Sequence, residues 1–168
     1  MQQLLILRHA KAVPWSPDTE DFPRKLSPAG RKHAQRLAAW MTENLPAPHS
    51  ILCSPSQRTR ETLAPLLAMQ PGLESITHFV PQIYLATFAT LETLLHSSFA
   101  ESDRVLIIGH NPGFETLVNR VIHPRHYDEF PRLATGTLAV VDFEPDWAES
   151  QGRGRLQALV RGKHLSVD

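Results

Sequence analysis

An arginine and a histidine stand side by side at the end of an apolar run near the start of the chain. The run, residues 4–7, predicts a buried strand, and Arg8 and His9 follow it directly. In open α/β sheets ligands bind beyond the carboxyl ends of the strands, so both side chains would face a ligand there. The arginine favours an anionic ligand and the histidine indicates chemistry. The alternative is a strand end with two solvated polar residues.

A second apolar run, residues 105–108, ends in a comparable way. Gly109 permits a tight turn there, and His110 follows at the carboxyl end of the predicted strand. Pro112 then opens a predicted helix, whose N-terminal dipole and free N–H groups favour an anion nearby. The two junctions therefore resemble each other, each with a histidine beside a feature that favours an anion.

Arginines follow a third predicted strand, residues 50–53, at the start of a helix predicted over residues 56–69. Arg58 and Arg60 lie in its first turns, where a cation opposes the helix dipole, so helix stability does not explain them. A phosphate bound at the start of the helix explains two arginines there. The alternative is pairing with Glu61 and its neighbours on the surface, and this alternative is stronger for Arg60 than for Arg58.

Apolar runs and helical periodicity alternate along the chain and predict one layered α/β domain over residues 1–168. We expect a mostly parallel central sheet of about six strands flanked by helices. Ser27 supplies an N-cap for the first helix, residues 144–155 form turns, and the proline-rich residues 13–25 form a loop over the site. The expected strands are residues 3–7, 50–53, 76–80, 105–108, 137–143 and 156–161, and the expected helices are residues 28–44, 56–69, 87–99 and 112–122.

Composition restricts the partners. Lys plus Arg and Asp plus Glu number 17 each among 168 residues, so no global field favours nucleic acid or an anionic membrane, and an anion site must be local. The single cysteine, Cys53, excludes an intramolecular disulfide and a cysteine cluster for zinc, and it fits a reducing compartment. No apolar stretch reaches the length of a signal peptide or a membrane span. We therefore expect a cytoplasmic protein that binds neither nucleic acid nor membranes.

Together the three strand ends resemble the histidine phosphatase superfamily over nearly the whole chain. That superfamily has Arg-His-Gly at the first strand end, an arginine after the second strand and a histidine after a later one. Its small bacterial phosphohistidine phosphatase branch is the most similar, on residues 8–11, 21–27, 54–62 and 109–112. The resemblance implies a hydrolase that removes phosphate from a phosphohistidine N–P bond on a protein, through a covalent phosphohistidine enzyme intermediate.

By this resemblance His9 is the nucleophile, while Arg8, Arg58 and His110 surround the phosphate oxygens. A largely neutral imidazole offers a lone pair without a separate base, and each arginine supplies forked donors worth roughly 3 kcal/mol in mutational tests. No metal or other cofactor is then required, and the sequence has no closely spaced ligand cluster. The implied partner is a phosphorylated protein, such as a histidine-containing phosphocarrier, or a small phosphoester.

The sequence departs from the superfamily pattern at two points. Ala10 replaces the glycine of the signature, as in the phosphohistidine branch. Many relatives have a carboxylate shortly after the third strand, whereas residues 83–87 contain none. Asp21 is the replacement candidate for the acid that protonates the leaving group, and Arg24 is a candidate phosphate contact. Weak provision of an acid favours N–P over O–P bonds, because a ring-protonated phosphohistidine can leave as neutral imidazole.

Two other functions stay open at this stage. One is a broad-specificity phosphomonoesterase with Asp21 as its acid, and the other is a catalytically silent phosphate-binding domain. A cysteine-dependent phosphatase fits poorly, because Cys53 and Arg58 have four intervening residues where that class has five, and Cys53 should be buried and inert. His123 and His126 lie three apart without further ligands, so we expect them at the surface rather than at a metal.

Overall fold

A six-stranded sheet forms the centre of the computed structural model, which describes residues 1–144, 146–149 and 151–166. The strand order across the sheet is β3-β2-β4-β1-β5-β6. This arrangement confirms the predicted α/β class with helices flanking the sheet. The strands are β1 (Gln2–Arg8), β2 (Ser50–Cys53), β3 (Thr77–Phe79), β4 (Arg104–Gly109), β5 (Thr137–Phe143) and β6 (Arg155–Arg161).

The first four strands of the sheet are parallel, and the last two pair in the antiparallel sense. β1 pairs with β4, β4 with β2, and β2 with β3, all in parallel register. β5 is antiparallel to β1, and β6 is antiparallel to β5. Because β1, β2 and β4 run in one direction, their carboxyl ends meet at the same edge of the sheet, which is where ligands bind in open α/β folds.

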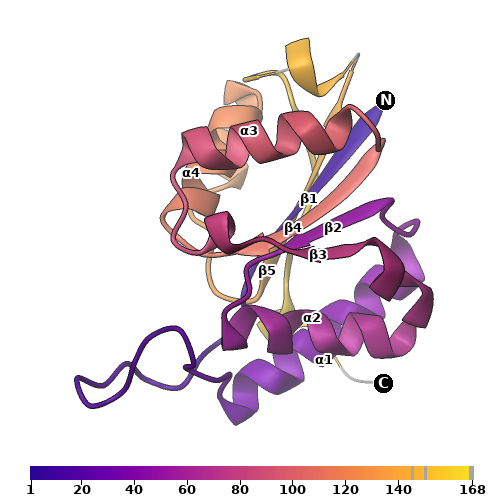
Figure 1. Cartoon of the computed structure of the whole chain (residues 1–168). Helices are drawn as coiled ribbons and strands as arrows, with labels where there is room; N and C mark the ends of the chain where they lie inside the picture. Colours follow the sequence, from indigo (N-terminus) through magenta and orange to yellow (C-terminus); the bar gives the residue numbers. More distant parts are fainter. Residues whose placement is uncertain (145, 150, 167–168) are drawn as a thin grey trace.

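Helices cover both faces of the sheet (Figure 1). α1 (Pro28–Asn44) and α2 (Gln57–Met69) pack on one face, and α3 (Phe88–Phe99) and α4 (Gly113–Val121) pack on the other. Coverage on both faces explains why β1 and β4 are continuous apolar runs rather than alternating ones. Successive residues of β1 point to opposite faces, so each face receives its own apolar core.

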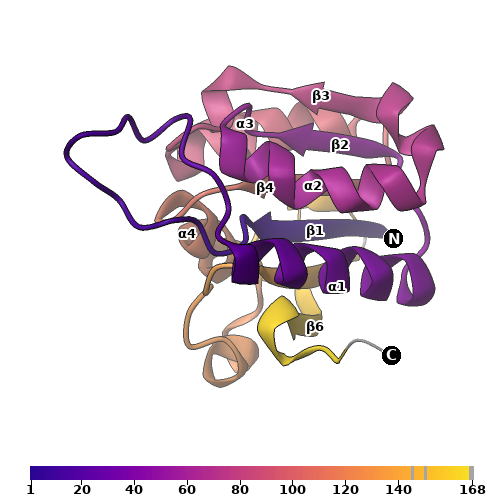
Figure 2. The same ribbon diagram turned by 90° about the horizontal axis from the view of Figure 1, so that it is seen from below.

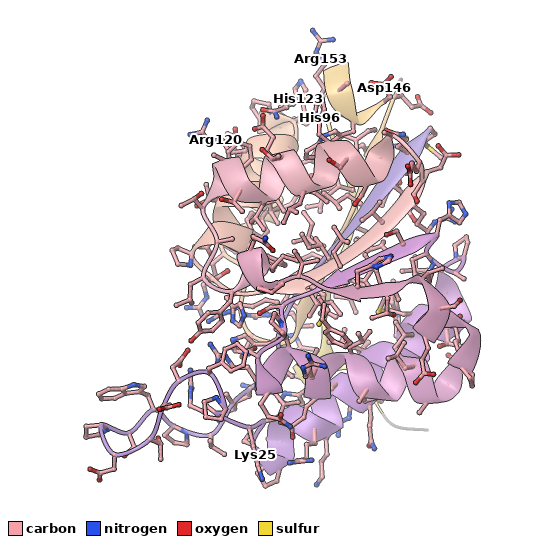
Figure 3. All side chains as sticks on the ribbon, viewed as in Figure 1. Lys25, His96, Arg120, His123, Asp146 and Arg153 are labelled. Carbon is pink, nitrogen blue, oxygen red and sulfur yellow. The ribbon has the colours of Figure 1, made fainter. Side chains whose placement is uncertain are left out.

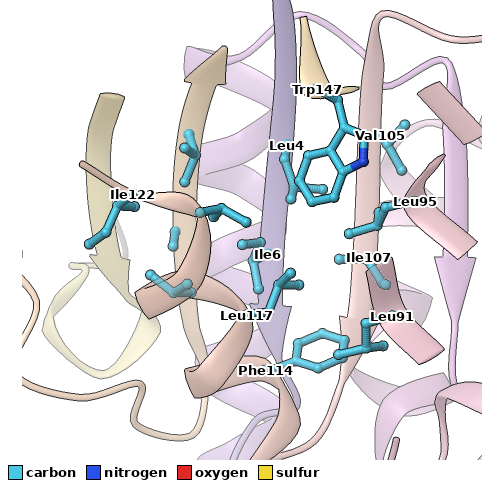
Figure 4. Close-up of a cluster of buried hydrophobic side chains, with 14 of the residues drawn as sticks. Leu4, Ile6, Leu91, Leu95, Val105, Ile107, Phe114, Leu117, Ile122 and Trp147 are labelled. Carbon is cyan, nitrogen blue, oxygen red and sulfur yellow. The ribbon is translucent and has the colours of Figure 1, made fainter. Parts of the chain in front are cut away.

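Figure 4 shows the core between the sheet and the helices α3 and α4. Leu4 and Ile6 of β1 meet Leu117 and Phe114 of α4 there, and all four side chains are fully buried or nearly so. Leu5 and Leu7 of β1 enter the opposite core, against α1 and α2. The two cores hold the central strands firmly, and the strands in turn fix the positions of the residues at their carboxyl ends.

The start of α1 follows the predicted capping pattern. The Ser27 side chain accepts a hydrogen bond from the Gly30 N–H at 3.0 Å, and Pro28 occupies the first turn. A Cβ atom on Gly30 would lie 1.9 Å from the Lys11 carbonyl oxygen. The chain that leaves β1 therefore passes against the first turn of α1 at a distance only glycine allows, which holds the segment after His9 in place.

The predicted element bounds agree with the structure to within two residues, and five short 3-10 helices were not predicted. The expected strand 76–80 is shorter, and the helices expected at residues 56–69, 87–99 and 112–122 each begin one residue later. Of the predicted turn over residues 144–155, residues 145 and 150 lie outside the described residues. The 3-10 helices are η1 (Pro71–Ile76), η2 (Pro81–Ile83), η3 (Pro124–Glu129), η4 (Trp147–Glu149) and η5 (Gly162–His164).

Candidate active site

Two imidazoles and one guanidinium group meet at the carboxyl edge of the sheet. His9 follows β1, His110 follows β4, and Arg58 lies in the first turn of α2. The ring centroids of the two histidines are 5.4 Å apart, and all three side chains are buried. The structure thus brings together residues separated by as many as a hundred positions in the sequence, at the edge where the strand ends predicted a site.

The His9 ring has a defined tautomer. Its Nδ1 lies 2.7 Å from the Ala10 carbonyl oxygen, and its Nε2 accepts a hydrogen bond from Nε of Arg58 at 3.3 Å. An arginine can only donate, so Nε2 carries the lone pair and Nδ1–H donates to the carbonyl. Burial, followed by the charges of Arg58 and Arg8, lowers the pKa of His9 to about 4. The ring is therefore neutral at pH 7, with an unprotonated Nε2 that faces the Arg58 guanidinium group.

Backbone hydrogen bonds tie His9 to its neighbours. Its N–H donates to the Gly109 carbonyl at 3.1 Å, and its carbonyl accepts from the Gly136 N–H at 2.8 Å. The next N–H, of Ala10, donates to Thr62 Oγ1 at 3.0 Å, and that hydroxyl donates to the carbonyl of Arg58 at 2.7 Å. Thr62 thus connects the end of β1 to the helical turn that carries the arginine, which fixes the distance between His9 and Arg58.

His110 is held between an arginine and a serine. Its Nδ1 accepts from an Nη2–H of Arg58 at 3.3 Å, so Nε2–H donates to Ser54 Oγ at 2.8 Å. Burial and then the charge of Arg58 lower the pKa of His110 to about 3. A phosphate dianion beside the ring would oppose both effects, because its negative charge favours the protonated form. His110 can then become a second cationic donor when a phosphoryl group is present.

Asp21 binds the outer edge of the Arg58 guanidinium group. Nη1 donates to the Asp21 carbonyl and Nη2 to its Oδ2, each at 2.9 Å. The Tyr84 hydroxyl donates to the same Oδ2, and Arg24 forms an ion pair with Oδ1 at 3.1 Å. Burial alone would raise the pKa of Asp21, but the hydrogen bonds from Tyr84 and Arg58 outweigh it and lower the pKa to about 2. Asp21 is therefore an ionised carboxylate near neutral pH.

Arg8, the last residue of β1, contacts the segment that precedes β5, and its charge helps to lower the pKa of His9. Its Nη1 donates to the Leu133 carbonyl at 3.1 Å, while its Nε is buried and finds no acceptor among the described residues. Burial lowers the pKa of Arg8, and the nearby Glu115 carboxylate opposes that shift. Glu115 also accepts from the Leu133 N–H at 2.6 Å, so the same carboxylate orders the loop that Arg8 contacts.

A family model described as the histidine phosphatase superfamily, branch 1, matches residues 4–78. The solved structure of a putative phosphohistidine phosphatase SixA from Agrobacterium tumefaciens superposes with a TM-score of 0.80 at 27% identity, over 95% of this chain and 97% of that one. The first half of the chain thus matches the histidine phosphatase superfamily, and the whole fold is similar to that of SixA. A second putative SixA, from Nakamurella multipartitia, has a TM-score of 0.80 at 24% identity, with 95% of both chains covered. An uncharacterised protein of Mycobacterium tuberculosis is 26% identical over 152 residues, which are 85% of this chain and 90% of its own length.

Two further residues contact the site and were not predicted from the sequence. Ser54 binds His110, and Tyr84 binds Asp21 and packs edge-on against His110 at 5.3 Å between ring centroids. The signal for Tyr84 was available, because Tyr84 and Thr87 are the polar residues of segment 83–87, which lacks the carboxylate of many relatives. Ser54 gave no such signal beyond its place after β2.

Arg60 lies away from the candidate site. Its guanidinium carbon stacks 3.9 Å from the centroid of the Phe79 ring, and its Nε donates to the Pro55 carbonyl at 2.9 Å. The predicted alternative of a surface arginine is right, although its partner is not Glu61, which pairs with Arg31 at 2.8 Å. The helix dipole argument therefore applies to Arg58 and fails for Arg60, where an aromatic face accounts for the cation.

The other reactive side chains are inert or occupied. Cys53 is fully buried, and that burial raises the pKa of its thiol to about 12, as expected for a structural cysteine. His126 was expected at the surface but is buried, because η3 turns it inward, where Nδ1 pairs with Glu129 at 3.1 Å. The described residues include no group of three or more His, Cys, Asp or Glu side chains arranged to hold a metal. Within the same described part of the chain, no helix is long and apolar enough to cross a membrane.

Proposed function

We propose that the protein hydrolyses the N–P bond of phosphohistidine on a protein, through a phosphoryl group carried on Nε2 of His9. The observation that supports this most is the tautomer of His9. Its Nδ1–H is bound to the Ala10 carbonyl, which leaves an unprotonated Nε2 beside the Arg58 guanidinium group. A nucleophile and a cation for phosphoryl oxygens are thus already oriented toward each other.

The first step transfers the phosphoryl group between two imidazoles. The Nε2 lone pair of His9 forms a bond to phosphorus while the substrate N–P bond breaks, and its electron pair stays on the substrate nitrogen. If the substrate ring carries a proton on its other nitrogen, it leaves as neutral imidazole. The enzyme ring gains the phosphoryl group and keeps its proton on Nδ1, where the Ala10 carbonyl accepts it. Arg58 and Arg8 neutralise the charge of the oxygens in transit.

In the second step a water molecule attacks the phosphorus. Its oxygen bonds to phosphorus, the bond to Nε2 breaks, and His9 returns to neutral imidazole with its proton still on Nδ1. The proton released by the water goes to a phosphate oxygen, either directly or by way of His110. Neither step in this scheme uses a metal ion or another cofactor.

An ionised Asp21 favours phosphohistidine over phosphate esters as the substrate. A serine alkoxide needs a proton as it leaves, whereas the pKa of Asp21, about 2, keeps its carboxylate unprotonated near pH 7. The role of Asp21 as a proton donor therefore stays a prediction. The hydrogen bonds to this carboxylate disfavour that role, because they keep it ionised. Arg24, which pairs with Asp21, stays a predicted phosphate contact. The proposal also retains a cytoplasmic location and a histidine-containing phosphocarrier as a candidate partner.

The test compares the rates at which the protein hydrolyses N–P and O–P bonds, in substrates supplied at equal concentration. We expect rapid release of phosphate from a phosphohistidine phosphocarrier protein and from free phosphohistidine, and slow release from phosphoserine and 4-nitrophenyl phosphate. His9→Gln should abolish both activities without unfolding the chain, as judged by circular dichroism. Hydrolysis of the esters at the rate of phosphohistidine would contradict the choice of substrate. Full activity of His9→Gln would show that His9 is not the nucleophile. If the wild type hydrolyses none of the phosphorylated compounds, the protein is a phosphate-binding domain and not an enzyme.

A further inference from the structure

Residues 13–25 form a projecting arm beside the active site. The base of the arm is closed by an isolated antiparallel bridge between Ala12 and Leu26 and by a hydrogen bond from the Val13 N–H to the Lys25 carbonyl at 2.9 Å. In Figures 1 and 2 the arm is the indigo loop that extends from the body at the edge where the parallel strands end. The sequence predicted a loop over the site, whereas most of this segment points away from it in both views.

The tip of the arm is exposed and has an unusual composition. Trp15 is 65% exposed, although tryptophan is the residue with the most apolar surface to bury. Residues 14–20 carry two carboxylates, Asp18 and Glu20, and no lysine or arginine. Both carboxylates are exposed, and neither forms an ion pair with any residue that the structure describes. Figure 3 shows side chains of the arm extending away from the rest of the molecule.

The arm is anchored to the catalytic arginine. Asp21 accepts two hydrogen bonds from Arg58, and the Phe22 carbonyl accepts from the Gln57 N–H at 3.1 Å at the start of α2. Phe22 also packs edge-on against Tyr84 at 5.1 Å between ring centroids. A molecule that binds the tip is therefore held next to the phosphoryl site, by an element in direct contact with it.

A second exposed apolar side chain follows Tyr84 directly in the sequence. Leu85 is 57% exposed and has a φ of 51°, in the left-handed region that a leucine rarely occupies. Strain of this kind persists where the surroundings impose it, and it gathers at functional sites. An exposed leucine and an exposed tryptophan thus lie on the two segments that converge at Tyr84 and Asp21. Exposed aromatic and aliphatic residues near a site are typical of protein interfaces.

We propose that the arm docks a protein substrate whose phosphohistidine lies on a basic surface. Trp15 packs into an apolar recess of that protein, and Asp18 and Glu20 pair with its lysines or arginines. This inference rests on the proposed function and narrows its substrate to a protein with a positively charged surface around the phosphohistidine. The chain as a whole is neutral, so the local charge of the tip, and not a global field, gives the partner its orientation. A free phosphohistidine at His9 gains nothing from a projecting tip.

The test uses one basic protein and one small compound as substrates. Histone H4 phosphorylated on its histidines supplies the basic surface, and free phosphohistidine supplies the bond alone. Trp15→Ala should raise KM for phosphorylated H4 about tenfold, the loss typical of an interface tryptophan, and leave kcat/KM for free phosphohistidine within about twofold. The double variant Asp18→Asn, Glu20→Gln should raise KM for H4 and weaken its dependence on salt concentration.

The residues for the matched controls lie at the end of the molecule opposite the carboxyl ends of the parallel strands. Met69→Ala removes an exposed apolar side chain from the last residue of α2, and Glu101→Gln with Asp103→Asn removes two carboxylates from the segment before β4. We expect both controls to match the wild type on both substrates. Trp15→Ala contradicts the proposal if it leaves KM for H4 unchanged, or if it impairs both substrates equally, because the arm would then act only through Asp21.

Binding without chemistry separates the docking proposal from the proposed function. The wild type should bind unphosphorylated H4, and Trp15→Ala should bind it about tenfold more weakly, in a titration that requires no turnover. A wild type that binds H4 through the arm but hydrolyses no phosphohistidine would refute the proposed activity alone. A wild type that hydrolyses free phosphohistidine but binds H4 no better than Trp15→Ala does would refute the docking surface alone.

Discussion

Acid should destabilise this protein through its two buried site histidines, and the contribution of His9 can be isolated. In the unfolded chain His9 takes up a proton near its ordinary pKa of about 6.5, whereas in the folded protein its pKa is about 4. Between these values the unfolded state binds more protons, so the free energy of unfolding falls as the pH falls, and above pH 6.5 it is unaffected. Each pH unit in that interval costs about 1.4 kcal/mol, which gives a loss of roughly 3 kcal/mol by pH 4.

Urea denaturation at several pH values measures this loss, with His9→Gln as the matched variant. Glutamine has similar size and hydrogen-bonding capacity but does not titrate, so groups such as His33 contribute equally to both proteins and cancel in the difference. His110, with a pKa of about 3, adds a loss of the same sign to both. We expect the wild type to lose about 3 kcal/mol more than the variant between pH 7 and pH 4. Parallel pH curves for the two proteins would refute the burial of a neutral His9.

Three substitutions and one control, Arg60→Lys, test the geometry around the site and the core. Arg58→Lys should lower kcat about a hundredfold, because lysine cannot reproduce the forked contacts to the two histidines, while Arg60→Lys should not; equal steady-state rates would contradict the assignment. Gly30→Ala should destabilise the fold by about 2 kcal/mol in urea denaturation, because its Cβ meets the Lys11 carbonyl oxygen. Leu117→Ala, which leaves a cavity in the core of Figure 4, should lower the free energy of unfolding by about 3 kcal/mol. A loss below about 1 kcal/mol would mean that the neighbouring side chains fill the cavity.

Residues 4–7 and 105–108 were predictable as central strands because continuous apolar runs require burial on both faces. Once they are central and parallel, the residues that follow them must share one edge of the sheet, so His9 and His110 could be placed together from the sequence. Arg58 followed by the same logic, since it opens the helix after β2. The helix over residues 28–44 was predictable in full, because Ser27 and Pro46 mark its two ends.

Contacts across the sheet edge were not predictable, because they depend on how loops fold back. Nothing in the local sequence indicates that Asp21 turns inward to Arg58 while Asp18, three residues earlier, stays in solvent. Arg60 shows a second limit. Its helical position resembles that of Arg58, and only the place of Phe79 on the neighbouring strand decides that it stacks on a ring. The 3-10 helices were not predicted either, because segments of three to six residues are too short to show periodicity.

The central claim is that Nε2 of His9 receives the phosphoryl group, and the most direct measurement is to locate that group on the chain. Brief incubation with a ³²P-labelled phosphohistidine protein, a quench in base and digestion should yield one labelled peptide containing residue 9, stable to base and labile to acid. Nuclear magnetic resonance of the ¹⁵N-labelled imidazole should then place the phosphorus on Nε2, because Nδ1 is bound to the Ala10 carbonyl. Label on Nδ1, on His110 or on any residue that persists in His9→Gln would contradict the account.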